Sequence, residues 1–145
     1  MASAQKFNQF VEELASGTHD MSTGTSHAFK MLLTNTAPIA ANSVKGDLTE
    51  ISGGNGYTSG GASCGTVTGA QTSGTFKLTL GTDPVWTASG GTIGPFRYAV
   101  LYNDTPTSPA DPLILFWDYG SSITLAAGET FTVDLDGSNG VLTIA

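Results

Sequence analysis

Hydrophobic and polar residues alternate with a period of two in residues 28–34 and again in most of the short segments after residue 65, whereas residues 38–65 are mostly irregular. In residues 75–80, for example, Phe76, Leu78 and Leu80 fall on one face of an extended chain and Lys77 on the other. Such alternation is typical of strands with one buried face. It predicts strands over residues 28–34, 66–72, 75–80, 84–89, 93–103, 113–118, 122–125, 130–135 and 141–144.

The longest predicted strand, residues 93–103, places Phe96 on the same face as Tyr98, Val100 and Tyr102. Residues 113–117 are apolar on both faces, which predicts a central strand. Residues 136–140 read DGSNG and predict a hairpin turn between the last two strands.

Before residue 16 the period is helical. Phe7, Phe10, Val11 and Leu14 follow i, i+3, i+4, i+7 spacing, with glutamates at positions 12 and 13 opposite them. This pattern predicts one short amphipathic helix within residues 5–15. A helix of this length is only marginally stable alone, so it must pack against another part of this chain or against a partner. Two interpretations stay open: it packs on its own domain, or it is an arm that reaches a neighbouring subunit.

Eight or nine short strands at intervals of 8–12 residues, with at most one short N-terminal helix, predict an all-β antiparallel sandwich. We expect a jelly-roll type, with another Greek-key sandwich as the second choice. Nineteen glycines and only 12% charged residues fit many strands joined by turns. The predicted organisation is an N-terminal arm over residues 1–26 and one β-sandwich domain over residues 27–145.

Charge and cysteine content restrict the partners. Five basic residues stand against twelve acidic ones, for a net charge of -7. Because the basic residues are scattered, we expect no direct nucleic-acid binding and no attachment to anionic membranes. No apolar segment is long enough to span a bilayer, and no secretory leader is visible at the N-terminus. The single cysteine, Cys64, excludes an intramolecular disulfide and fits synthesis in a reducing cytoplasm.

Three motifs are candidates for chemistry. Residues 61–65, GASCG, match the spacing of a hydrolase nucleophile elbow around Ser63, but a glycine-rich loop precedes them and a strand is predicted after them. Residues 134–140, DLDGSNG, resemble a calcium loop without the glycine and glutamate that an EF-hand needs. The pair His19-Asp20 reads either as an acid–base pair or as a turn in which the aspartate caps backbone amides. We therefore expect no enzyme, no cofactor and no metal site.

Aromatic residues are the remaining candidates for a binding surface. Trp86, Tyr98, Tyr102, Trp117 and Tyr119 lie on or next to predicted strands. Aromatics at such positions are usually core or inter-subunit contacts, and the alternative is a platform on which a sugar ring stacks.

Several stretches resemble small structural proteins of tailed bacteriophages. They are LTNTAP at 33–38, DLTEI at 47–51, GNGYT at 54–58 with GG at 60–61, WTASGGTIGPFRYAV at 86–100 and WDYG at 117–120. The similarity spans most of residues 29–135 and is greatest to the capsid-decorating, or cement, proteins of HK97-like shells. Members of that group are often jelly-roll proteins that form dimers or trimers.

The resemblance implies a non-enzymatic virion protein, made in the bacterial cytoplasm, that binds the outside of the capsid and bridges major capsid protein subunits. The expected partners are the major capsid protein and further copies of this chain. The alternative is a tail-fibre or receptor-binding module that recognises glycans. The candidate subunit-contact regions are the N-terminal segment and loop 38–65, and the candidate residues are Phe7, Phe10, Val11, Leu14, Tyr57, Trp117 and Tyr119.

Overall fold

The computed structural model describes residues 2–145, so residue 1 of the predicted arm lies outside the description. Antiparallel strands dominate, and the described residues contain one α-helix. The elements are β1 Gln5–Lys6, α1 Gln9–Ala15, β2 Phe29–Thr34, the 3-10 turn η1 Lys45–Asp47, β3 Ala62–Ser63, β4 Val67–Thr72, β5 Thr75–Leu80, β6 Val85–Thr87, β7 Ile93–Asn103, β8 Leu113–Leu125, β9 Thr130–Thr132 and β10 Leu142–Ile144. The predicted all-β class with antiparallel sheets is confirmed.

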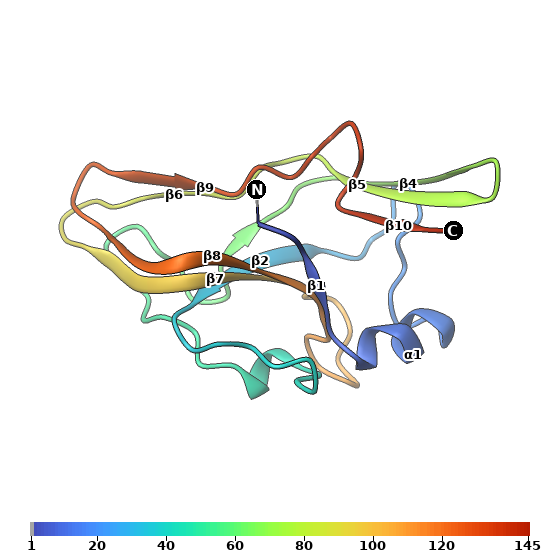
Figure 1. Cartoon of the computed structure of the whole chain (residues 1–145), viewed down its shortest axis with the longest axis horizontal. Coiled ribbons are helices and arrows are strands. Elements are labelled where there is room, and N and C mark those ends of the chain that lie inside the picture. Colours follow the sequence, from blue (N-terminus) through green and yellow to red (C-terminus); the bar gives the residue numbers. More distant parts are fainter. Residues whose placement is uncertain (1) are drawn as a thin grey trace.

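The strands form one large sheet and two small ones. The large sheet has the order β1-β8-β7-β2-β3, and the small sheets are β10-β5-β4 and β6-β9. Both small sheets lie over the same face of the large sheet, as the upper layer in Figure 1. These layers agree with a sandwich, whereas this strand order does not confirm the jelly-roll topology, which stays a prediction.

Both faces of the large sheet are buried. The main core fills the space between the layers, and its buried residues include Met31 and Leu101 of the large sheet together with Leu78 and Trp86 of the small sheets. A second core covers the opposite face and contains Phe7, Leu32, Val100, Tyr102, Leu113 and Phe116. The irregular segment that follows β2 and carries η1 runs beneath this second face (Figure 1). Burial on both sides explains why β2 and the first half of β8 are almost continuously apolar.

The face assigned to Phe96 from the alternation is wrong. The β7–β8 register shifts between Phe96 and Tyr98, so Phe96 joins Ala99 and Leu101 in the main core. Tyr98 and Val100 belong to the second core. A β-bulge interrupts the period of two, and every residue beyond it changes face.

The N-terminal segment is part of the sheet. Gln5 and Lys6 pair with β8, and the helix starts only at Gln9. Phe7 is completely buried against Phe116, with ring centroids 5.0 Å apart. Phe10 is buried in the main core. The helical spacing in the sequence therefore spans a two-residue strand, a connection that holds Phe7 and a helix that holds Phe10, and both phenylalanines lie inside the domain.

The turn at residues 136–140 forms, but it does not close a hairpin. Strand β9 pairs with β6, whereas β10 pairs with β5, so the chain crosses here from one small sheet to the other. Asp136 Oδ1 accepts hydrogen bonds from the backbone N–H groups of Ser138 and Asn139, each 2.8 Å long. These bonds are those of a capped turn.

Candidate functional site

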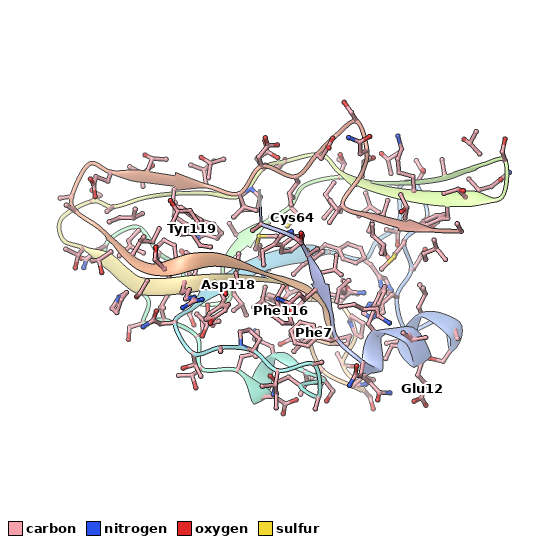
Figure 2. The ribbon with its side chains drawn as sticks, viewed as in Figure 1. Phe7, Glu12, Cys64, Phe116, Asp118 and Tyr119 are labelled. Carbon is pink, nitrogen blue, oxygen red and sulfur yellow. The ribbon has the colours of Figure 1, made fainter. Side chains whose placement is uncertain are left out.

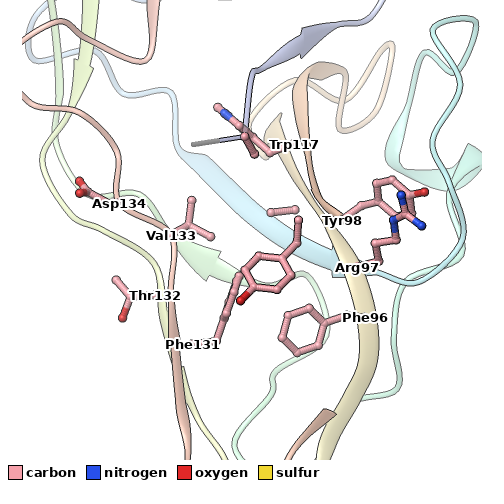
Figure 3. A pocket seen from close by; sticks show the side chains of 11 residues that line it. Phe96, Arg97, Tyr98, Trp117, Phe131, Thr132, Val133 and Asp134 are labelled. Carbon is pink, nitrogen blue, oxygen red and sulfur yellow. The ribbon is translucent and has the colours of Figure 1, made fainter. Parts of the chain in front are cut away.

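An aromatic cleft opens between the large sheet and β9. It has a volume of about 230 Å³. Strands β7 and β8 form one wall and β9 with the residues after it forms the other, as Figure 3 shows. The lining residues are Ala2, Phe96, Arg97, Tyr98, Ala99, Trp117, Tyr119, Phe131, Thr132, Val133 and Asp134.

Phe131 is the centre of an aromatic cluster in this cleft. Its ring meets Phe96 edge-on with centroids 5.0 Å apart, and Tyr119 edge-on at 5.8 Å. Trp86 stacks on it from the main core at 6.2 Å. Edge-to-face and stacked pairs are the favourable arrangements of aromatic rings. Tyr119 is nevertheless 57% exposed, so the cluster extends from the core to the surface.

A bulge in β8 places Tyr119 in the cluster. Between Asp118 and Ile123, β8 uses five steps of chain where β7 uses two, from Tyr98 to Phe96. Gly120 adopts φ +100° within these extra residues, a backbone conformation that favours glycine. The extra residues take Tyr119 out of the regular alternation, and its ring meets the opposite layer. Bulges commonly redirect a side chain in this way.

Of the two charged residues on the cleft lining, Arg97 has an ion-pair partner, whereas Asp134 has none within residues 2–145. Arg97 donates from Nε and Nη2 to the two carboxylate oxygens of Asp118, at 2.7 and 2.8 Å. These bonds, with a further one from the Gly120 N–H, lower the pKa of Asp118. Asp134, also on the lining, is exposed and takes part in no ion pair or side-chain hydrogen bond within residues 2–145. The rim therefore carries one uncompensated negative charge.

Trp117 and Tyr119 are the predicted contact residues that lie in this cleft, where Trp117 is half-buried. Val11 is 51% exposed and Leu14 half-buried on α1, so both keep surface for a partner. The alternation-based prediction misassigned Phe96, and the pattern that included Asp134 was the calcium-loop resemblance of residues 134–140, which did not point to this cleft. The sequence cue for the cleft is the glycine–serine stretch at 120–122 inside an otherwise strand-like segment.

The prediction of contact residues is wrong for Phe7, Phe10 and Tyr57, because these side chains are buried within the chain itself. The Tyr57 hydroxyl donates to Glu50 Oε1 at 2.6 Å and accepts the N–H of Leu33 at 3.0 Å. It thus fastens the loop after β2 to the sheet. Of loop 38–65, it is the exposed Ile39 rather than Tyr57 that presents a large apolar side chain to solvent.

The GASCG motif lies on an edge of the large sheet. Ser63 is in the two-residue strand β3, which pairs with β2, and its Oγ accepts the N–H of Gly65 at 3.1 Å. Burial of Cys64 raises the pKa of its thiol to about 12. Strand β4, not a helix, follows the motif. The strand–turn–helix context of a nucleophile elbow is therefore missing.

His19 belongs to a buried polar cluster at the end of β7. Asn103 Nδ2 donates to Nδ1 of His19 at 3.2 Å and to Nδ1 of His27 at 2.9 Å. His19 then carries its proton on Nε2 and donates to Glu13 Oε2 at 3.3 Å. Burial, followed by the charge of His27, lowers the pKa of His19 to about 4.

The same cluster places Glu13 inside the protein, contrary to the predicted outward face. Glu13 is 4% exposed, and its burial, followed by the charge of Glu12, raises its pKa. The neighbouring Asp20 accepts the N–H and the hydroxyl of Ser22, which is the capped turn that was one of the two interpretations of His19-Asp20. The cluster fastens α1 and the loop after it to β7.

No helix in the part of the chain that the structure describes is both long and apolar enough to cross a bilayer. Within residues 2–145, no three histidine, cysteine, aspartate or glutamate side chains are grouped so that they could hold a metal ion. Comparison with protein-family models, with curated proteins and with solved structures found no match.

Proposed function

We propose that this chain is a non-enzymatic capsid decoration protein of a tailed bacteriophage. It binds the outside of the assembled shell and stabilises the shell by bridging major capsid protein subunits. Two things support the proposal: the resemblance of residues 29–135 to such proteins, and the aromatic cleft described above. The cleft is the observation that carries it.

The cleft differs from the rest of the surface because its apolar groups are clustered aromatic rings. A second hollow beside α1 has Leu14, Phe76 and Ile144 on its lining, with Phe76 as its one phenylalanine, tyrosine or tryptophan. A cluster of aromatic rings around a hollow is typical of a contact site. Within residues 2–145 every buried side-chain polar atom has a hydrogen-bond partner, so the scaffold is complete without a partner. The exposed rings are thus available for an external contact.

A second contact surface on α1 would make bridging possible. Val11 and Leu14 expose apolar atoms there, and α1, marked by Glu12 in Figure 2, lies well apart from Tyr119 along the long axis. Two modest contacts on two shell subunits give a large combined affinity, because the second contact forms within an existing complex. Either surface could also join copies of this chain into a dimer or trimer.

The net charge of -7 predicts that basic patches on the shell attract the protein. Attraction between exposed charges is screened over about 10 Å at 0.1 M salt. We therefore expect binding to weaken as the salt concentration rises.

The test is co-sedimentation of the purified protein with capsids that lack it, at low and high salt. We expect saturable binding that falls at least tenfold with Tyr119→Ala and is unchanged with Val85→Ala, which removes a similarly exposed apolar side chain from β6. Absence of binding at every salt concentration would overturn the proposal.

The second candidate is glycan recognition by a tail-fibre or receptor-binding module. The exposed ring of Tyr119 beside Thr132 and Asp134 favours it, because sugars are bound by aromatic faces together with hydrogen-bonding groups. A glycan array separates the two candidates. Saturable sugar binding that Trp117→Ala abolishes without unfolding the protein would favour the second.

A further inference from the structure

We infer that the aromatic cleft accepts an extended peptide segment, which inserts one non-polar side chain against the Tyr119–Phe131 ring pair and places a basic side chain beside Asp134. The inference deepens the proposed function and rests on it in one respect: the segment would belong to the shell protein. Size, backbone edge and charge each support this occupant.

The cleft has the size of one large side chain. Its volume of about 230 Å³ is below the range of about 300–1,000 Å³ that encloses a drug-sized ligand. Aromatic rings form its walls and Phe96 and Ala99 contribute apolar surface. A non-polar side chain that enters this space buries its surface against rings that the scaffold already holds in place, which is the usual form of a binding hot spot.

The wall formed by β9 offers backbone hydrogen bonds. Among residues 2–145, β6 is the one strand that pairs with β9, so the other side of β9 is a sheet edge. The bonds from Val133 N to Pro84 O and from Ala88 N to Glu129 O fix the alternation of this ladder. By that alternation, Thr130 and Thr132 direct their N–H and C=O groups away from β6. An extended peptide can pair with such an edge while alternate side chains enter pockets beside it.

The negative charge of Asp134 at the rim of the cleft favours a basic side chain in the bound peptide. Arg97 is already engaged by Asp118 through two hydrogen bonds, whereas Asp134 has no such partner within residues 2–145. Phe131 and Val133 face the cleft, whereas Asp134 points to the opposite side of this segment (Figure 3). A lysine or arginine directly next to the inserted side chain would lie on the opposite face of an extended peptide, and so on the side of Asp134. An acidic segment would be repelled by Asp134 and by the net charge of -7.

A peptide is favoured over a sugar because the cleft combines an apolar hollow with the free backbone edge of β9. A peptide can use both, since its own N–H and C=O groups pair with the edge while a side chain enters the hollow. A sugar ring has no backbone with which to extend the sheet.

The experiment is selection of random seven-residue peptides displayed in a library, against the wild-type chain and in parallel against Tyr119→Ala. We expect enriched peptides to carry one large non-polar residue with a lysine or arginine at the adjacent position. Their affinity, measured by titration, should fall at least tenfold with Tyr119→Ala and about threefold to tenfold with Asp134→Asn. Ile39→Ala and Glu12→Gln, which change an exposed apolar and an exposed acidic residue away from the cleft lining, should leave it unchanged.

Several outcomes would overturn the inference: no enrichment over the Tyr119→Ala selection, enrichment of acidic peptides, or sugar binding in place of peptide binding. The proposed function is judged separately by capsid co-sedimentation. Capsid binding that is insensitive to Tyr119→Ala would leave the function standing and remove the peptide site. If selective peptides are found but the protein binds no capsid, the peptide site stands and the proposed function is overturned.

Discussion

The two ends of β7 differ in which side chains are exposed to water and which are buried. Near its start, beside Arg97, the aromatic cleft leaves Tyr119 57% exposed. At its end, Asn103 is completely buried and binds two histidines. One end keeps apolar groups outside, and the other keeps polar groups inside. Both arrangements depart from the usual distribution, and such departures are the informative ones.

The difference indicates what each end is for. The polar end is closed: Asn103, His19 and Glu13 satisfy one another, and they join the N-terminal segment to the sheet. The aromatic end is open, since nothing within residues 2–145 covers the outer face of Tyr119. We therefore expect substitutions at the polar end to reduce the stability of the fold, and substitutions at the aromatic end to reduce binding.

The largest effect is expected from Asn103→Ala. Loss of the amide leaves Nδ1 of His19 without its donor, removes one of the two donors to Nδ1 of His27 (the other is the N–H of Asp20), and opens a cavity beneath the loop. Unsatisfied buried groups cost about 1–3 kcal/mol, and the total loss in the free energy of unfolding should be about 2–4 kcal/mol. Urea denaturation measures it. Asn139→Ala, which removes an exposed amide from the 136–140 turn, is the control and should cost under about 1 kcal/mol. Equal losses in the two variants would show that the cluster has no special role.

The cluster also shows where sequence reasoning fails. Local periodicity predicted the strands well: residues 75–80 and 93–103 coincide with β5 and β7. It could not predict that Asn103 meets His19, because the two are 84 positions apart and neither belongs to a periodic pattern. The buried position of Glu13 depends on the same long-range contact, so the outward face expected from the helix was wrong.

The cleft was predictable in part. Trp117 and Tyr119 were expected to serve contacts, and the structure places both at the cleft. Their relation to Phe131 depends on the bulge around Gly120, which shifts the register by a number of residues that no alternation rule supplies. The same shift moved Phe96 to the other face. Strand pairing across layers, unlike strand location, is set by tertiary packing.

The second prediction concerns the pH dependence of the free energy of unfolding. The pKa of His19 is about 4 in the folded chain against 6.5 ordinarily, so the unfolded chain binds more protons between these values. Stability is therefore complete above pH 6.5 and is lost as the pH falls towards 4. At about 1.4 kcal/mol per unit, the loss is at most about 3 kcal/mol. The raised pKa of Glu13 acts in the opposite direction and offsets part of it.

Urea denaturation at pH 7 and pH 4.5 measures this loss. The groups that face His19 are Glu13, His27 and, through the same loop, Asp20. His19→Gln keeps a donor and an acceptor without the titration, so it should remove most of the difference between the two pH values, whereas Asp20→Asn should not. An unchanged pH dependence in His19→Gln would contradict the assignment to His19.

The third prediction tests the bulge. Gly120 has φ +100°, and no atom lies within 4 Å of the position that a Cβ would occupy there, so Gly120→Ala meets backbone strain without a clash. We expect a loss in stability of about 1 kcal/mol. Gly128→Ala, at φ +92° and equally open, should cost the same. Only the change at position 120 should weaken peptide or capsid binding, because only that glycine positions Tyr119. Equal binding by both variants would contradict the role of the bulge in positioning Tyr119.

The smallest effect on stability is expected from Tyr119→Ala. The ring contacts Phe131 edge-on, and such pairs contribute about 0.5–1.5 kcal/mol when buried. With 57% of the residue exposed, the loss should be near the lower value, and the melting temperature should fall by only a few degrees. Phe131→Ala, which empties the centre of the same cluster, is the comparison and should cost several times more, because Trp86 and Phe96 pack on that ring. A large loss from Tyr119→Ala would mean that the exposed ring holds the two layers together, and the contrast between the two ends of β7 would then fail.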